Sequence, residues 1–175
     1  MRLLLVCCVL LFLTSCNTVR VAYDYDKRTN FNNYTTYNYF SDVETGLSVF
    51  DDRRLFSVLD STLRAKGFLQ VEEPDFYINI QSEEFQSAPS TNNVGVGIGG
   101  TNRNMGGGMT IGIPMGRSGL QRQLQFDFVD SQTNKMFWQG VGSANYKEKA
   151  TPVEREQQIQ RVVHKIFSKF PPSKN

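Results

Sequence analysis

The sequence has few of the side chains that build disulfides, metal sites and catalytic triads. Its 175 residues include three cysteines and a single histidine, His164. Cys7 and Cys8 lie in an apolar N-terminal run that we expect to be removed, which leaves Cys16 as the thiol of the mature chain. One thiol excludes an internal disulfide, and one thiol with one histidine is too few for a cysteine–histidine zinc site. We expect neither a metal nor a cofactor.

A strong excess of charge of one sign is missing as well. Lysine and arginine number 19 against 17 aspartates and glutamates, so the formal net charge is +2. Domains that bind nucleic acid carry a basic face or stripe, which this balance does not supply. Apolar residues at 39% and aromatic residues at 12% are too frequent for a disordered chain. We expect a folded protein that binds no nucleic acid.

No apolar run is long enough to cross a membrane as a helix. Residues 3–13 form an unbroken apolar run of eleven residues, whereas a spanning helix needs about 20. Preceded by Arg2, this run fits the hydrophobic region of a secretory signal peptide. The sequence Leu-Thr-Ser-Cys at 13–16 then resembles the lipobox of bacterial lipoproteins, in which cleavage leaves a diacylglyceryl cysteine at the N-terminus. This predicts removal of residues 1–15 and lipidation of Cys16. The alternatives are an ordinary signal peptide or a buried strand, with Cys16 incidental.

Lipidation of Cys16 would decide where the protein lies. Several acyl chains anchor a protein stably, whereas a single chain attaches reversibly. Asn17 stands where an aspartate often retains a lipoprotein in the inner membrane, so we expect the outer membrane. Residues 16–18 form a short tether that reaches about 10 Å at most. The domain that follows, residues 19–172, is expected to lie close to the bilayer in the cell envelope, on the periplasmic side or at the cell surface.

Strand patterns recur along this domain. Period-two alternation of apolar and polar residues, together with aromatic and β-branched content, predicts strands at 19–25, 34–40, 75–81, 120–130 and 136–146. Residues 30–33 are expected to form the turn between the first two. Polar residues 131–134 should turn the last two strands into antiparallel neighbours.

Two stretches have helical periodicity instead. Residues 48–66 carry one apolar stripe, with Asp51 in the first turn, where the helix dipole favours acid, and Gly67 at the end. The second helix begins at Thr151-Pro152, with Glu154 placed for a capping box. This order of elements predicts a single α+β domain. We expect a two-layer sandwich in which two helices cover one face of a mainly antiparallel sheet.

A glycine-rich stretch interrupts the pattern. Gly95, Gly97 and Gly100 have the spacing of a dinucleotide-binding turn, but no helical pattern follows them, and such a turn must open a helix. We therefore expect no nucleotide. Apolar residues alternate with glycines on both sides of a loop, which indicates a hairpin insertion at about 92–116. It is either a flexible insertion or a contact surface for a partner, a sheet or the bilayer.

The remaining reactive side chains form no catalytic pattern. His164 lies on the second helix, where a lone histidine is usually a surface or packing residue, and the nucleophile motif G-x-S-x-G is absent. The acidic pairs at 72–73 and 83–84 are expected to be solvated. Five tyrosines either line a groove or, more commonly in a sheet, pair with aromatic neighbours across strands: Tyr23, Tyr25, Tyr34, Tyr37 and Tyr39. We expect no catalytic residues.

Several segments occur together in a recognisable order. They include V-A-Y-D-Y-D at 21–26, N-F-N-N-Y-T-T-Y at 30–37, F-W-Q-G at 137–140 and K-F-P-P at 169–172. With these segments the chain resembles the bacterial envelope lipoproteins of domain-of-unknown-function family 4136, although Phe40 stands where a tryptophan is usual. The resemblance implies a lipid-anchored α+β domain and brings no established activity or catalytic residue.

These features predict a lipid-anchored envelope protein that is not an enzyme. Besides the membrane, its expected partner is an envelope protein, a lipid or a glycan. The alternative is a structural subunit whose glycine-rich hairpin adds a strand to the sheet edge of a partner. An envelope hydrolase is the least supported of the three hypotheses.

Overall fold

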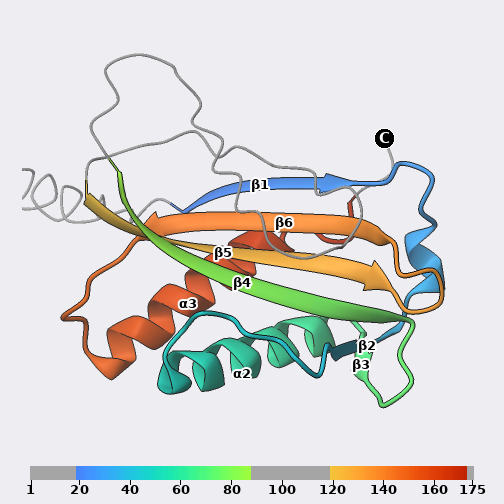
Figure 1. Cartoon of the computed structure of the whole chain (residues 1–175), viewed down its shortest axis with the longest axis horizontal. Coiled ribbons are helices and arrows are strands. Elements are labelled where there is room, and N and C mark those ends of the chain that lie inside the picture. Colours follow the sequence, from blue (N-terminus) through green and yellow to red (C-terminus); the bar gives the residue numbers. More distant parts are fainter. Residues whose placement is uncertain (1–18, 88–118, 173–175) are drawn as a thin grey trace, which may run out of the picture.

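The computed structural model describes residues 19–87 and 119–172, which form a six-stranded sheet with two α-helices (Figure 1). No helix within these ranges is long and apolar enough to span a bilayer. In chain order the elements are β1 (Arg20–Tyr25), the 3-10 helix η1 (Phe31–Asn33), β2 (Thr36–Tyr39), α2 (Val49–Ala65), β3 (Leu69–Gln70), β4 (Phe76–Ser87), β5 (Gly119–Asp130), β6 (Met136–Asn145) and α3 (Pro152–Phe167).

The sheet is mixed but mainly antiparallel, and its strand order is β1-β6-β5-β4-β2-β3. The first four strands in that order pair antiparallel, whereas β2 runs parallel to both β4 and β3. Both helices lie on the same face of the sheet (Figure 1). The predicted two-layer α+β sandwich is therefore confirmed.

The predicted strands are present, but the first two are not neighbours. β1 pairs with β6 at one edge of the sheet, and β2 pairs with β4 on the far side of β5. The connection between them, predicted as a simple turn, contains η1. Its Phe31 packs edge-on against Phe137 and Phe170, with 5.9 Å between ring centroids in both pairs. Because an aromatic ring buries a large apolar area, this contact favours a connection that crosses the end of the core.

The predicted start and end of α2 and the predicted start of α3 are confirmed. The Ser48 side chain caps α2 by accepting a hydrogen bond from the backbone N–H of Asp51 at 3.3 Å. Gly67 follows that helix with a φ of +90°, a conformation that favours glycine. At the start of α3, Thr151 and Glu154 form the reciprocal capping box. These caps satisfy backbone groups that lack partners within the helix.

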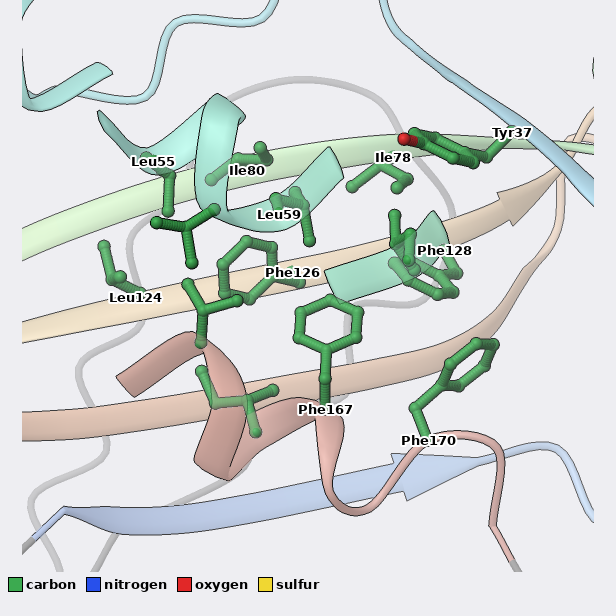
Figure 2. Packing of buried hydrophobic residues seen from close by; sticks show 14 of the residues in the cluster. Tyr37, Leu55, Leu59, Ile78, Ile80, Leu124, Phe126, Phe128, Phe167 and Phe170 are labelled. Carbon is green, nitrogen blue, oxygen red and sulfur yellow. The ribbon is translucent and has the colours of Figure 1, made fainter. Parts of the chain in front are cut away.

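Apolar side chains from the sheet and both helices fill the space between the two layers. Phe126 and Phe128 of β5 face Phe167, the last residue of α3, and Phe170, which follows the helix, and Leu59 of α2 lies beside them (Figure 2). The ring centroids of Phe128 and Phe170 are 4.8 Å apart. Burying one such side chain contributes about 1.5–3 kcal/mol, and a one-residue slip would turn the whole apolar row towards solvent. The core therefore sets the register of the sheet.

Helix α3 packs directly on the backbone of β6 at two glycines. A Cβ atom on Gly140 would lie 2.7 Å from Cγ2 of Ile166 and 2.8 Å from Cζ2 of Trp138. A Cβ atom on Gly142 would lie 2.7 Å from Cδ1 of Ile166. Real Cβ contacts essentially never fall below 3.0 Å. The helix docks at this distance because these positions have no side chain.

The predicted signal peptide (1–15), the tether (16–18) and the glycine-rich insertion (92–116) lie outside the described residues. β4 and β5 pair along their full length, so that Ser87 lies opposite Gly119. Residues 88–118 thus connect two adjacent ends of one long antiparallel pair.

Candidate functional site

An open cavity of about 490 Å³ lies at the end of the molecule where both helices begin. Its wall includes the first turn of α2 around Asp51 and the start of α3 around Arg155. Arg122 of β5 and Tyr146, just after β6, line it from the side of the sheet. β1 also begins at this end of the molecule (Figure 1).

Asp51 is at the centre of the charged wall, and its side chain is only 1% exposed. Its Oδ1 accepts a hydrogen bond from Nη1 of Arg54 at 2.9 Å. Its Oδ2 accepts from Nη1 of Arg122 at 3.0 Å and from Nη1 of Arg155 at 3.2 Å. Guanidinium groups from α2, β5 and α3 therefore converge on one carboxylate. These ion pairs tie the two layers together at this end.

A second layer of contacts orients the arginines. Arg122 donates to Oε1 of Glu84 through Nε at 3.0 Å and through Nη2 at 2.6 Å. Its guanidinium also stacks on the ring of Tyr146, 3.8 Å from the centroid, as expected for a cation–π contact. Arg155 donates from Nη1 to the Tyr146 hydroxyl at 2.6 Å. The planar guanidinium suits such combined stacking and hydrogen bonding better than an ammonium group would.

The cluster carries an excess of positive charge. Arg54, Arg122 and Arg155 face two carboxylates, Asp51 and Glu84, so these five side chains sum to +1. Burial works to raise the pKa of Asp51, but its ion pairs with Arg122, Arg155 and Arg54 outweigh burial and hold that pKa below its usual range. Asp51 therefore stays ionised, and one positive charge remains on the cavity wall.

The sequence patterns do not mark this cavity. They mark Asp51 only as an acid suited to the start of a helix. Its partners Arg122 and Arg155 lie 71 and 104 residues away in the sequence, where no local spacing marks them as a group. In the sequence, Asp51 falls on the same helical face as the apolar stripe. A carboxylate on a buried face needs a charged partner, and this is the one signal in the sequence that points to a buried ion pair.

A second buried carboxylate lies on the opposite face of the sheet. Asp127 alternates with the core residues of β5 and accepts hydrogen bonds from three side-chain amides. The donors are Nε2 of Gln139 at 2.7 Å, Nε2 of Gln125 at 3.1 Å and Nδ2 of Asn79 at 3.4 Å. Burial raises the pKa of Asp127, and these neutral donors offset the effect only in part.

Replacing Asp127 with asparagine is expected to stabilise the protein at neutral pH. Because the folded-state pKa of Asp127 is raised, its favourable contribution is complete below the unfolded-state pKa and is lost as pH rises through the folded-state pKa. An asparagine avoids this loss, since it carries no charge and the Asn79 amide can turn its oxygen towards the new donor. In urea unfolding across the acidic to neutral range, the gain of the variant over wild type should grow with pH. A variant less stable than wild type at every pH would contradict this account of Asp127.

The residues singled out in the sequence have different places. Cys16 and the glycine-rich insertion lie outside the described residues. His164 is exposed on α3, as expected for a surface residue, nine residues beyond Arg155. Nine residues of α-helix rise about 13 Å, so His164 takes no part in the cavity.

Two of the tyrosines and one of the acidic residues have structural partners. Tyr37 and Tyr39 both donate hydrogen bonds to Oδ1 of Asp60, at 2.9 Å and 2.5 Å. Their rings pack edge-on against each other with centroids 5.9 Å apart, so the packing interpretation holds for this pair. Glu83 and Glu84 are both exposed, as expected, and Glu84 in addition forms an ion pair with Arg122, because β4 and β5 place the two side by side.

The cavity is suited to holding charge. Within residues 19–87 and 119–172, no group of three histidine, cysteine, aspartate or glutamate side chains could hold a metal ion. Guanidinium groups that are oriented in advance and partly exposed bind oxyanions through charge-assisted hydrogen bonds. The arrangement can therefore bind an anionic group at the mouth of the cavity.

Comparison with known proteins adds a fold-level likeness. The crystal structure of a PDZ domain protein from Parabacteroides distasonis matches 90% of this chain with a TM-score of 0.54 and 13% identity, and the chain spans only 37% of that protein. Two structures of a PelC dodecamer from Paraburkholderia phytofirmans match at 11% identity. One aligns 90% of this chain with 100% of that chain at a TM-score of 0.47, and the other 83% with 95% at 0.45. At such identities the likeness concerns the fold alone.

No curated protein matches the sequence. The family model described as "Domain of unknown function (DUF4136)" matches residues 21–172. That range runs from within β1 to beyond the end of α3, so it includes the sheet, both helices and the charged cavity. The chain therefore belongs to the DUF4136 family.

Proposed function

We propose that this protein is a lipid-anchored lipoprotein of the bacterial cell envelope, in the outer membrane, whose domain binds a ligand without chemical turnover. One observation carries the proposal. β1 begins at Arg20, four residues after the lipobox cysteine Cys16, and it begins at the same end of the molecule as the positively charged cavity (Figure 1). An anchor at Cys16 would place that cavity beside the bilayer.

Strand register limits the distance between Cys16 and the cavity wall. Arg20 of β1 lies opposite Ser143 of β6, and Arg122 of β5 lies opposite the next residue, Ala144. Since adjacent strands are about 4.8 Å apart, the backbones of Arg20 and Arg122 are about 10 Å apart. Four residues reach about 14 Å at most. The cavity wall is thus within about 25 Å of the proposed lipid attachment site.

The chemistry of the cavity supports binding rather than catalysis. A general base works best with a pKa near the operating pH. The pKa of Asp51 is lowered by its ion pairs, so this carboxylate is a poor proton acceptor. The other charged side chains of the cluster are held in ion pairs with one another. Such groups orient and hold a charged ligand.

Replacing Cys16 with serine is expected to move the protein out of the membrane fraction, because serine cannot form the thioether that carries the acyl chains. Membrane and soluble fractions are compared after expression in a bacterial host, and the mass of the purified wild-type protein is measured. The wild-type mass should correspond to cleavage before Cys16 with added acyl chains.

The matched control is Cys8→Ser, which alters a cysteine inside the segment that is removed. It should leave both the mature mass and the membrane location unchanged. An unmodified Cys16 thiol in the wild-type protein, or a Cys16→Ser protein that stays in the membrane fraction, would reject the proposed anchor.

A further inference from the structure

Exposed apolar side chains surround the charged cavity. Val49 and Phe50, in the first turn of α2, are 65% and 68% exposed, and Val153, in the first turn of α3, is 62% exposed. Phe50 also lines the cavity itself. Three large apolar residues beside guanidinium groups match the composition of surfaces that lie at the boundary between headgroups and acyl chains.

We propose that this end of the domain rests on the membrane and that the cavity binds the phosphodiester of a phospholipid headgroup, while Val49, Phe50 and Val153 enter the edge of the acyl layer. The inference deepens the proposed function and rests on it, because the anchor at Cys16 brings this end to the bilayer. It adds a ligand class and the residues that recognise it.

Charge complementarity favours a phosphodiester. The five charged side chains of the wall sum to +1, and a phosphodiester carries one negative charge. Arg54 donates to Asp51 through Nη1, which leaves other N–H groups of its five-donor fork for a ligand. This side chain is partly exposed and lines the cavity, so a headgroup can reach it. The guanidinium fork matches the geometry of phosphate oxygens.

The helices add to the attraction for an anion. α2 and α3, with 17 and 16 residues, both begin at the cavity. The N-terminus of a helix carries about half a positive charge, and two of them lie beside the three arginines. Asp51 and Glu84 are the opposing carboxylates of the wall, but Asp51 is paired with three arginines and Oε1 of Glu84 already accepts two hydrogen bonds from Arg122. The volume of about 490 Å³ also exceeds what one phosphate needs and leaves room for a headgroup.

The tether favours the bilayer as the source of the phosphate. The 12 residues of β5 span about 40 Å, whereas residues between Cys16 and Arg20 reach about 14 Å. The tether therefore holds the end with the cavity near the membrane and does not hold the far end. Phospholipid is the phosphate compound present at high density in that position.

The test uses the native acylated protein with one fluorescent reporter. Once Cys16 carries lipid, the mature chain has no free thiol, so an introduced cysteine is the only one that can be labelled. Val49→Cys places an environment-sensitive dye beside the cavity. Leu69→Cys is the matched control, since Leu69 in β3 is similarly exposed at 61% and lies towards the other end of the molecule (Figure 1). Acylation is verified by mass before reconstitution, which separates failure of the anchor from failure of this inference.

Each labelled protein is reconstituted into phospholipid vesicles and into vesicles of digalactosyldiacylglycerol, a lipid without phosphate. We expect the emission of the dye at position 49 to shift to the blue in phospholipid vesicles. In galactolipid vesicles this shift should be at least twofold smaller. The dye at position 69 should show no shift in either lipid. Arg54→Gln should reduce the shift at position 49 at least twofold. Arg53→Gln, which alters the exposed neighbour on the same helix, should leave it unchanged.

Several results would overturn the inference. Equal emission at positions 49 and 69 in phospholipid would mean that this end does not meet the bilayer. Equal shifts in the two lipids, or equal effects of Arg54→Gln and Arg53→Gln, would show that the cavity does not bind the phosphodiester. Inorganic phosphate is also titrated in maltoside micelles. If it binds as tightly as dihexanoylphosphatidylglycerol, the cavity is a site for free phosphate and not for a lipid headgroup.

Discussion

Replacing Asp51 with asparagine is expected to lower the free energy of unfolding by about 3–5 kcal/mol, the range found when one partner of a buried ion pair is removed. The asparagine is nearly isosteric, so packing changes little. It leaves Arg122, which is almost fully buried, facing Arg54 and Arg155 without the carboxylate that holds the three together. Denaturant unfolding followed by circular dichroism measures the loss.

Two controls isolate the ion pairs from other effects at Asp51. Glu154→Gln removes an exposed first-turn carboxylate from α3, while the glutamine oxygen can still accept the capping hydrogen bond from the Thr151 N–H, so it reports mainly the lost charge at a helix N-terminus and should change stability little. The pH dependence is the second control. Since the pKa of Asp51 is lowered by folding, its contribution is present above the unfolded-state pKa and is lost as pH falls through the folded-state pKa. The difference between wild type and Asp51→Asn should therefore shrink in acid, and a constant difference would argue against the ion pairs as its cause.

Placing valine at Gly140 should destabilise the protein by about 3 kcal/mol, at the upper end of the usual effect of overpacking a core. Even the first added carbon would lie 2.7 Å from Cγ2 of Ile166 and 2.8 Å from Cζ2 of Trp138. Both neighbours belong to the buried core, so neither can move into solvent. The helix must then lift away from the sheet, and thermal or urea unfolding should report the loss.

A double-mutant cycle tests whether the clash with α3 is the cause. Ile166→Ala alone should cost about 2–5 kcal/mol as a large-to-small core change. The double variant with Gly140→Ala should lose less stability than the sum of the two single variants. The smaller side chain at position 166 relieves the clash with the new methyl group, and that methyl group fills part of the cavity that Ile166→Ala leaves. Ser143→Ala, on the same strand, adds no atom and should be near neutral. Strict additivity of Gly140→Ala and Ile166→Ala would show that close docking of α3 is not what the glycine provides.

Packing at Gly140 also explains the composition of the segment F-W-Q-G at 137–140. In F-W-Q-G at 137–140, Trp138 and Gly140 face the helices, and the absence of a side chain at Gly140 makes room for the indole ring and for Ile166. Gln139 points to the other face, where it donates to Asp127. The motif therefore combines a core aromatic, a partner for a buried acid and a docking point for α3 within four residues.

Local patterns predicted the elements well because their causes are local. The capping box at Thr151 and Glu154 joins residues three positions apart, and Gly67 ends α2 through its own backbone conformation. The alternation along β5 directly separates core residues from residues on the opposite face. By contrast, the two-residue strand β3 is too short to show any period, and it forms because β2 supplies its hydrogen-bonding partner.

Local sequence patterns were enough to predict the class of the fold, the caps of both helices and a lipid anchor at Cys16. These follow from spacings of two to four residues and from the short run before the cysteine. Tertiary structure alone decided that β1 lies beside β6, that α3 docks on glycines, and that Asp51 meets arginines 71 and 104 residues away. An arginine and an acid that are far apart in the sequence form no local pattern. They become partners only because the packing of a shared core brings their helices and strands to the same end of the molecule.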